Sequence, residues 1–138
     1  MIPLPPKAKQ LLDDANFVVV GTSNTDGSPQ TSVLWATYEG DQVLLSTIQG
    51  RKKETNWLKD PRVSVLILDR DDPYCYVEVR GTVSMSTQGG PELIERLSQA
   101  YTGRRYTGDE GTDNIRVVVR VTPKHIVDRR PGSHDQPS

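Results

Sequence analysis

Three consecutive cations, Arg51, Lys52 and Lys53, fall where the sequence predicts the start of a short helix. A helix N-terminus carries a partial positive charge, so each cation there costs about 0.3–1 kcal/mol unless an anion compensates it. The first-turn N–H groups lack partners within the helix, and with Arg and Lys side chains they form a site for phosphate. Ser46 and Thr47 end the preceding strand and bring two hydroxyls to the same place. The sequence therefore predicts a phosphate site, with a solvated surface cluster as the alternative.

The other residues with reactive side chains form no catalytic or metal-binding pattern. His125 and His134 have no second histidine or cysteine at ligand spacing, so surface or packing roles are expected for them. Cys75 is the only cysteine, and such a residue is more often a small buried side chain than a nucleophile. The motifs of serine hydrolases, phosphate-binding loops and zinc proteases are absent from the sequence. We therefore expect no metal ion and assign no catalytic side chain.

Composition and length limit the class of protein. The chain has 138 residues, enough for one domain, which we place at residues 1–130, and the polar residues 131–138 predict a flexible tail. The net charge of −1 argues against a general nucleic-acid-binding protein, which is normally basic. No apolar run reaches the ~18 residues of a membrane span, and the N-terminus lacks the apolar core of a signal peptide. We expect a cytoplasmic protein.

The elements that must position the cations are mostly strands. Alternating apolar residues between Gly and Pro turns predict strands, and apolar residues at helical spacing predict helices. Helices are expected at Pro5–Asn16, Arg51–Lys59 and Gly89–Gly103, and strands at Phe17–Ser23, Gln30–Ile48 (two, joined at Glu39–Asp41), Arg62–Asp69, Tyr74–Ser86 and Ile115–Asp128 (one or two, kinked at Pro123). Six or seven strands with few helices predict an antiparallel α+β domain, mostly β, built on a small barrel.

Some of these strands carry apolar residues on both faces. In the strand before the cations, Val43 and Leu45 lie on one face and Leu44 and Ile48 on the other. A strand that is apolar on both faces must be covered on both faces. In a chain of this size a second copy of the chain is an expected cover, which predicts a homodimer.

Four segments carry a resemblance to a known family: VVVGTSNTDGSPQTSVLW, LLSTIQGRKKETNWLKDPRVSVLI, YVEVRGTV and VTPKHIVDRRPG. The second is the most specific, because it places a strand, R-x-K-x-x-N and D-P-R-x-S in that order. Over Leu4–Pro131 the chain resembles the pyridoxamine 5′-phosphate oxidase-like (PPOX class) flavin and deazaflavin oxidoreductases, and most of all the branch that uses coenzyme F420. The resemblance implies an FMN-binding-like split β-barrel that works as a homodimer with cofactor sites at the interface.

The resemblance also implies roles for individual residues. It places the cofactor phosphate on Arg51–Lys53 with Asn56 one turn on, and the ring or ribityl part on Ser46–Ile48. Backbone groups of Gln30–Trp35 would bond the pyrimidine edge of the ring, and Tyr76 would reach the cofactor from the other subunit. The implied cofactor-binding residues are Gln30, Ser32, Val33, Leu34, Trp35, Ser46, Thr47, Ile48, Arg51, Lys52, Lys53, Asn56 and Tyr76. For Trp35 the alternative is a core position, and Trp57 is expected to pack.

These observations predict an F420-dependent oxidoreductase that transfers hydride between the deazaflavin and a small organic substrate. An FMN-dependent or pyridoxamine phosphate oxidase-like enzyme on the same fold is an alternative, although the C-terminal segment VDRRPGSHDQPS lacks the tryptophan of true pyridoxamine phosphate oxidases. The non-enzymatic hypotheses are a protein that binds or sequesters F420, flavin or haem, and a bare interaction domain. Asp69–Tyr74 and Arg104–Asn114 are the expected substrate-side loops, and Arg116 and Arg120 are expected on a solvated or interface strand face.

Overall fold

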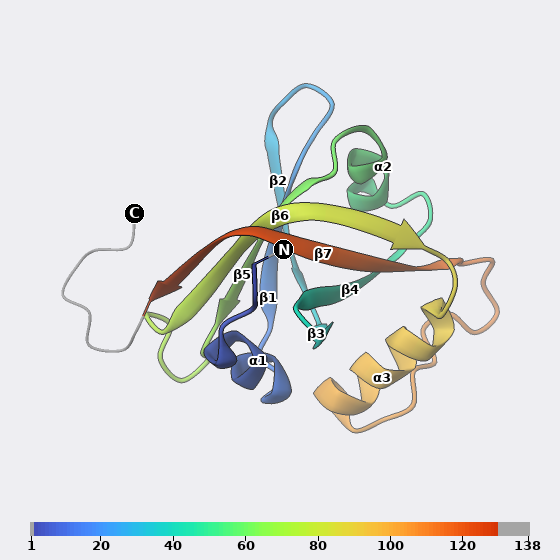
Figure 1. Cartoon of the computed structure of the whole chain (residues 1–138). Helices are drawn as coiled ribbons and strands as arrows, with labels where there is room; N and C mark the ends of the chain where they lie inside the picture. Colours follow the sequence, from blue (N-terminus) through green and yellow to red (C-terminus); the bar gives the residue numbers. More distant parts are fainter. Residues whose placement is uncertain (1, 130–138) are drawn as a thin grey trace.

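Seven strands form one antiparallel sheet that curls into a half-barrel (Figure 1). The computed structural model describes residues 2–129. The strands are β1 (Val18–Ser23), β2 (Pro29–Leu34), β3 (Ala36–Glu39), β4 (Gln42–Ile48), β5 (Arg62–Leu68), β6 (Tyr76–Ser86) and β7 (Arg116–Arg129), in the sheet order β2-β1-β5-β6-β7-β4-β3. The helices of the described part are α1 (Pro6–Asp13), α2 (Lys52–Lys59) and α3 (Gly90–Thr102). The predicted α+β, mostly β, split-barrel class is confirmed.

The two outer strands of the sheet, β2 and β3, follow one another in the chain and meet at Trp35. The prediction of a single strand over this stretch is wrong, because the backbone leaves the ladder with β1 at Trp35 and joins the ladder with β4. β3 pairs with β4 only as far as Leu45, so Ser46–Ile48 pairs with β7 alone. The barrel is therefore split between β2 and the second half of β4.

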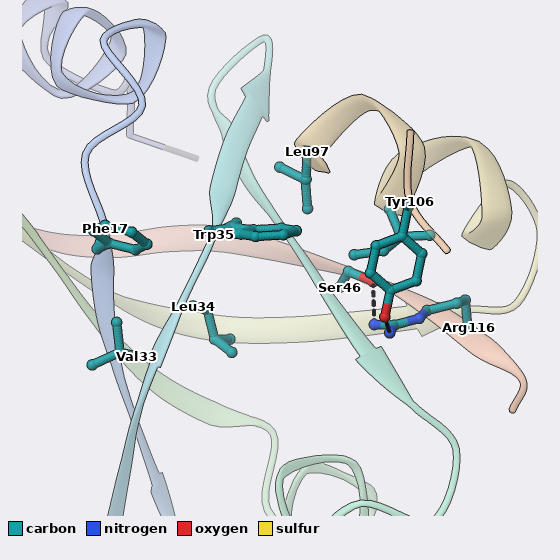
Figure 2. A pocket seen from close by; sticks show the side chains of 9 residues that line it. Phe17, Val33, Leu34, Trp35, Ser46, Leu97, Tyr106 and Arg116 are labelled. Carbon is teal, nitrogen blue, oxygen red and sulfur yellow. Dashed lines mark hydrogen bonds between the residues drawn. The ribbon is translucent and has the colours of Figure 1, made fainter. Parts of the chain in front are cut away.

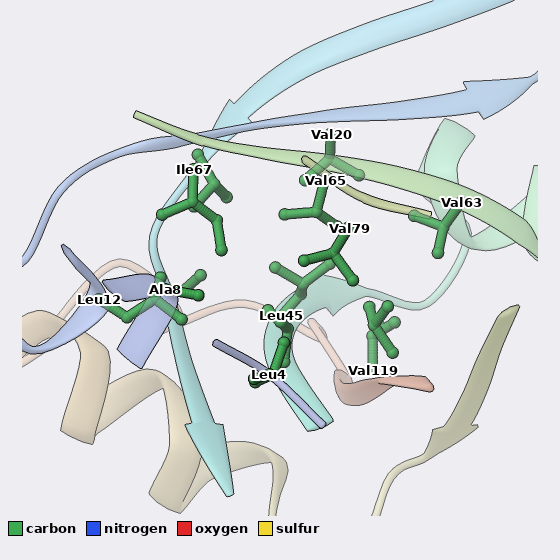
Figure 3. Packing of buried hydrophobic residues seen from close by; sticks show 14 of the residues in the cluster. Leu4, Ala8, Leu12, Val20, Leu45, Val63, Val65, Ile67, Val79 and Val119 are labelled. Atoms are coloured by element: carbon green, nitrogen blue, oxygen red, sulfur yellow. The ribbon is translucent and has the colours of Figure 1, made fainter. Parts of the chain in front are cut away.

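The core fills the inner face of the sheet with branched aliphatic side chains (Figure 3). Side chains alternate along a strand, so every second residue of β1 and β5 is buried. Leu4 and the apolar side of α1, with Ala8 and Leu12, close the open end of this core. Trp57 of α2 packs into the same cluster and is 3% exposed, which confirms its predicted packing role.

A second apolar cluster lies on the outer face of β4 and β7. Leu44 and Val118 from these strands pack against Leu93 and Leu97 of α3. The prediction that the strand before the cations is covered on both faces is therefore confirmed. The cover over Leu44 is α3 of the same chain rather than a second copy, so this pattern gives no support to a dimer.

A register shift between Arg80 and Gly81 of β6 marks the place where β7 bends. Pro123 lies opposite Gly81, and a Cβ at Gly81 would come within 2.0 Å of the Thr122 carbonyl oxygen, so only glycine fits. The predicted kink at Pro123 is thus an irregularity within one continuous strand. The bend lets the first half of β7 run beside β4 at the split.

The polar tail predicted for residues 131–138 lies outside the described residues, as does the boundary at residue 130. Among residues 2–129, the helices are all too short or too polar to cross a membrane.

Candidate functional site

A cavity of about 270 Å³ lies at the split of the barrel (Figure 2). Aromatic and aliphatic side chains form most of its wall, and a serine hydroxyl and a guanidinium form the polar part. It is lined by Phe17, Val33, Leu34, Trp35, Ser46, Ile94, Leu97, Tyr106 and Arg116. The structure thus brings together four of the predicted cofactor-binding residues, Val33, Leu34, Trp35 and Ser46, from two separate segments.

Tyr101 of α3 packs against Trp35, the residue between β2 and β3. Its ring stacks on the indole of Trp35, with centroids 5.6 Å apart and planes inclined by 19°. Its hydroxyl donates to the Asn16 carbonyl at 2.6 Å and accepts from the Ala36 N–H at 3.1 Å. Burial raises the pKa of Tyr101, so the hydroxyl keeps the proton that it donates. Trp35 therefore both packs against α3 and lines the cavity.

Backbone hydrogen-bonding groups border both sides of the split. β2 is an outer strand, and Ser46–Ile48 has a strand partner on one side only, so N–H and C=O groups on these edges have no strand partner. The Ser32 hydroxyl is also buried without a hydrogen-bond partner among residues 2–129. Ser46 reaches the cavity, whereas strand alternation turns Thr47 to the other face, and Ile48 is buried without lining the cavity.

Arg116 is the polar residue of the site that the sequence analysis missed. It was expected on a solvated or interface face with Arg120, but its side chain is only 11% exposed. Its guanidinium donates to Asp109 at 2.7 Å, to the Tyr106 hydroxyl at 2.5 Å and to the Ser46 hydroxyl at 3.3 Å. No local sequence signal marks this role, because it depends on the loop before β7 folding back over the strand.

Asp109 is the carboxylate that Arg116 holds at the start of β7. Hydrogen bonds from Arg116, then one from Asn114 and the charges of Arg116 and Arg51, lower the pKa of the Asp109 carboxyl despite some burial. The N-terminus of α2 is close to this cluster, because the Arg51 N–H donates to the Ile48 carbonyl at 3.0 Å and Ile48 lies opposite Arg116 in the ladder of β4 and β7. The cavity and the predicted phosphate anchor are therefore neighbours.

The three cations at the start of α2 do not point to one place. Lys53 is half-buried, and burial followed by the charge of Arg51 lowers its pKa. Lys52 is exposed, and its charge contributes less than the hydrogen bonds from Ser28 to the lowered pKa of Asp26. Within residues 2–129 none of the three forms an ion pair. Arg51 and Lys53 thus make a local positive charge without a carboxylate partner.

Polar contacts with neighbouring segments hold α2 in position. Glu54 accepts a hydrogen bond from the Gly50 N–H at 3.0 Å, while Arg51 at the N-cap gives no side-chain cap to the first turn. Asn56 is 1% exposed and donates to Thr22 at 2.9 Å and to Asn24 at 3.1 Å. Asn56 therefore braces the helix against β1, and the structure does not bring it to the cavity.

Two other predicted site residues also lie away from the cavity. Gln30 accepts a hydrogen bond from the Thr22 hydroxyl at 2.9 Å. The same hydroxyl accepts the hydrogen bond from Asn56. Tyr76 pairs with Leu68 and Arg129, at the end of β7 opposite to Arg116. Of the two predicted substrate-side loops, Arg104–Asn114 supplies Tyr106 to the wall, and Asp69–Tyr74 supplies no residue.

The family model for pyridoxamine 5′-phosphate oxidase matches residues 4–129 of the chain. The chain belongs to this family. Among solved structures, an F420 reductase is similar to this family member, with 26% sequence identity and a TM-score of 0.79 over 90% of this chain and 98% of that one. No curated protein sequence matches the chain.

Two more distant structures share the fold. The conserved hypothetical protein Rv2991 from Mycobacterium tuberculosis has 21% identity and a TM-score of 0.73, covering 100% of this chain and 94% of its own. General Stress Protein 26 from Bacillus anthracis has 22% identity and a TM-score of 0.69, covering 89% of this chain and 91% of its own. At these identities the likeness is one of fold.

The residues at the split fit the flavin or deazaflavin cofactors of this oxidoreductase family. The cavity of about 270 Å³ lies just below the ~300–1,000 Å³ of ligand pockets, so it suits a ring system with its tail outside. Strand-edge backbone groups border the cavity, and Arg51 and Lys53 supply uncompensated charge beside it. The site has room for a planar ring in the cavity and positive charge for a phosphate at Arg51 and Lys53.

Proposed function

We propose that this protein is an F420-dependent oxidoreductase that transfers hydride between the deazaflavin and a small organic substrate. The observation that carries the proposal is that Arg51 and Lys53, which form no ion pair among residues 2–129, begin the helix next to the cavity at the split. The F420 reductase that shares 26% identity over 98% of its own chain favours the deazaflavin over FMN. When bound, the cofactor supplies the hydride chemistry, so the protein needs no acid–base pair of its own.

The chain's own residues bind and orient under this proposal. Arg51 and Lys53 hold the phosphate by charge-assisted hydrogen bonds, helped by the first-turn N–H groups of α2. The Ser46 hydroxyl and the free edge of β2 orient the ring. Trp35 and Tyr106 form walls that exclude water from the reacting face, which keeps reduced cofactor from unwanted reactions.

We further propose that two copies of the chain form the working unit. Phe17 and Val33 lie at the cavity but are 50% and 63% exposed, which leaves apolar surface at its mouth. Contiguous exposed apolar surface beside a cavity is typical of a surface that another chain covers. Tyr76 is far from the cavity of its own chain, so it could contribute only to the site of a partner.

The test is a fluorescence titration of the purified, cofactor-free protein with F420 and separately with FMN. We expect micromolar or tighter binding of F420 and at least tenfold weaker binding of FMN. Preference for FMN would assign a flavin enzyme on the same fold, and tight F420 binding without turnover of any electron acceptor would indicate a carrier. Binding of neither cofactor would contradict the proposal and leave Arg51–Lys53 as a surface cluster.

A further inference from the structure

We propose that Arg116 is a positioning residue that shapes the ring pocket and keeps the phosphate anchor free of Asp109. This inference rests on the proposed function, since it concerns how the same site holds its cofactor. Arg116 is the first residue of β7 and lies opposite Ile48 of β4, so its backbone is fixed by the ladder beside the split. Nothing in its role requires contact with the reacting atoms.

The guanidinium of Arg116 connects the loop after α3 to β4. It donates to Ser46 on β4, to the hydroxyl of Tyr106 in the loop after α3, and twice to Asp109 further along that loop. It also lies over the Tyr106 ring, with the guanidinium carbon 5.0 Å from the ring centroid. A planar side chain with donors on several edges can do this, whereas a lysine ammonium cannot reach all three partners.

The ring pocket of about 270 Å³ and a second cavity of about 360 Å³ share the wall made by Ile94, Tyr106 and Arg116. Figure 2 shows the Tyr106 hydroxyl directed at the Arg116 guanidinium at the edge of the ring pocket. The second cavity is lined by Pro91, Ile94, Glu95, Tyr106, Asp109, Glu110, Asn114 and Arg116. Without the guanidinium this wall loses its anchor and the two cavities can merge.

Arg116 also engages the Asp109 carboxylate, with hydrogen bonds of 2.7 and 3.2 Å. Arg51 begins the neighbouring helix, since its N–H donates to the carbonyl of Ile48, the residue opposite Arg116. If Arg116 is removed, Arg51 is the cation that remains near this carboxylate. Asp109 would then compete with a phosphate for Arg51. A substitution at Arg116, which is not part of the anchor, is therefore expected to weaken phosphate binding.

The experiment compares Arg116→Ala, Arg116→Lys and the double variant Arg116→Ala/Asp109→Asn with the wild-type protein. The matched control is Arg105→Ala, which removes an exposed ion pair with Glu110 in the same loop. The probes are F420, the phosphate-free deazaflavin riboside and inorganic phosphate, each titrated by fluorescence or calorimetry. Amide hydrogen exchange of residues 104–114 is measured in parallel without any ligand.

We expect Arg116→Ala to weaken F420 binding about tenfold or more and to speed exchange in residues 104–114, with Arg105→Ala close to wild type. Arg116→Lys should recover only part of the affinity. The double variant should regain inorganic phosphate affinity but not riboside affinity, because only the competition at Arg51 is relieved. If Arg116 only stabilises the fold, its loss lowers the affinities for F420, the riboside and inorganic phosphate together, and the double variant restores none of them.

The two proposals fail in different ways. If the wild-type protein binds neither F420 nor the riboside, the proposed function fails. In that case, amide hydrogen exchange of residues 104–114 that is as slow in Arg116→Ala as in the wild-type protein would overturn the positioning role as well. If the wild-type protein binds F420 and Arg116→Ala binds it equally well, the positioning role is overturned while the proposed function stands.

Discussion

At the scale of single residues, Lys53 is a half-buried cation that forms no ion pair among residues 2–129. Burial and the neighbouring Arg51 lower its pKa, which means that the folded, ligand-free protein disfavours its protonated form. A phosphate beside it would reverse that effect, since an anion favours the charged ammonium. The same charge that is unfavourable in the free protein is therefore favourable in the complex.

We predict that Lys53→Met weakens binding of a simple phosphate monoester about tenfold or more, without lowering the stability of the free protein. In the wild-type protein, affinity should fall as the pH rises toward the lowered pKa of Lys53, below the ordinary lysine value of 10.5, because the ammonium loses its proton. Phosphate monoesters keep their charge over this range, since their second pKa is about 6. Calorimetric titration from pH 8 to 10 measures both effects.

The control for this prediction is Lys59→Met, at the other end of α2. It removes a charge of the same sign from the same helix and should leave the affinity unchanged. Lys53→Arg should bind phosphate without the fall at high pH, because the guanidinium stays protonated. Equal affinities for Lys53→Met and Lys59→Met would rule out Lys53 as an anchor.

At the scale of elements, the position of the anchor depends on how α2 is attached to the sheet. Asn56 donates hydrogen bonds to Thr22 on β1 and to Asn24 in the turn that follows. Thr22 in turn donates to Gln30 on β2. These contacts are buried or partly buried, so a lost donor leaves polar atoms without a partner. The brace sets where the first turn of α2 lies relative to the split.

We predict that Asn56→Ala lowers the free energy of unfolding by about 1–3 kcal/mol, the cost of leaving buried polar groups unpaired. Urea denaturation followed by tryptophan fluorescence gives this value. Thr55→Ala is the control, because Thr55 is a half-exposed neighbour on the same helix and should change stability by less than about 0.5 kcal/mol. A similar loss in both variants would show that Asn56 has no special role in the brace.

At the scale of the whole molecule, the outer face of β5 and its neighbours is the surface that we assign to a second copy. β5 turns Leu66 and Leu68 outward, where they are half-buried, and next to them lies a groove of about 560 Å³ that includes Ser64 and Arg80. α3 covers β4, not this face. Tyr76 pairs with Leu68 of β5, so it lies beside this surface.

We predict that the protein is a dimer in solution and that Leu66→Arg converts it to a folded monomer with at least tenfold weaker F420 binding. The reason is that a buried, unpaired charge at an interface is strongly unfavourable. Light scattering after gel filtration measures the mass. Ala100→Arg on the exposed side of α3 is the control, and a wild-type monomer that binds F420 tightly would contradict the prediction.

The sequence by itself determined most of the helices and strands and predicted where the anchor would lie. Alternating valines predict strands because side chains alternate along an extended backbone, and Pro91 and Gly103 limit α3 through local backbone preferences. The cations directly follow β4 in the chain, so their place beside the split needed no long-range information. Each of these features depends on neighbours within a few residues.

Only the tertiary structure decided what depends on contacts between distant segments. The break at Trp35 arises because β2 and β3 join different ladders, and Asn56 turns inward because Thr22 lies opposite it. Arg116 is mostly shielded from solvent because a loop after α3 folds back over the start of β7 and places Asp109 against it. Burial and charge pairing of this kind involve residues far apart in the chain, so no local pattern of residue types could reveal them.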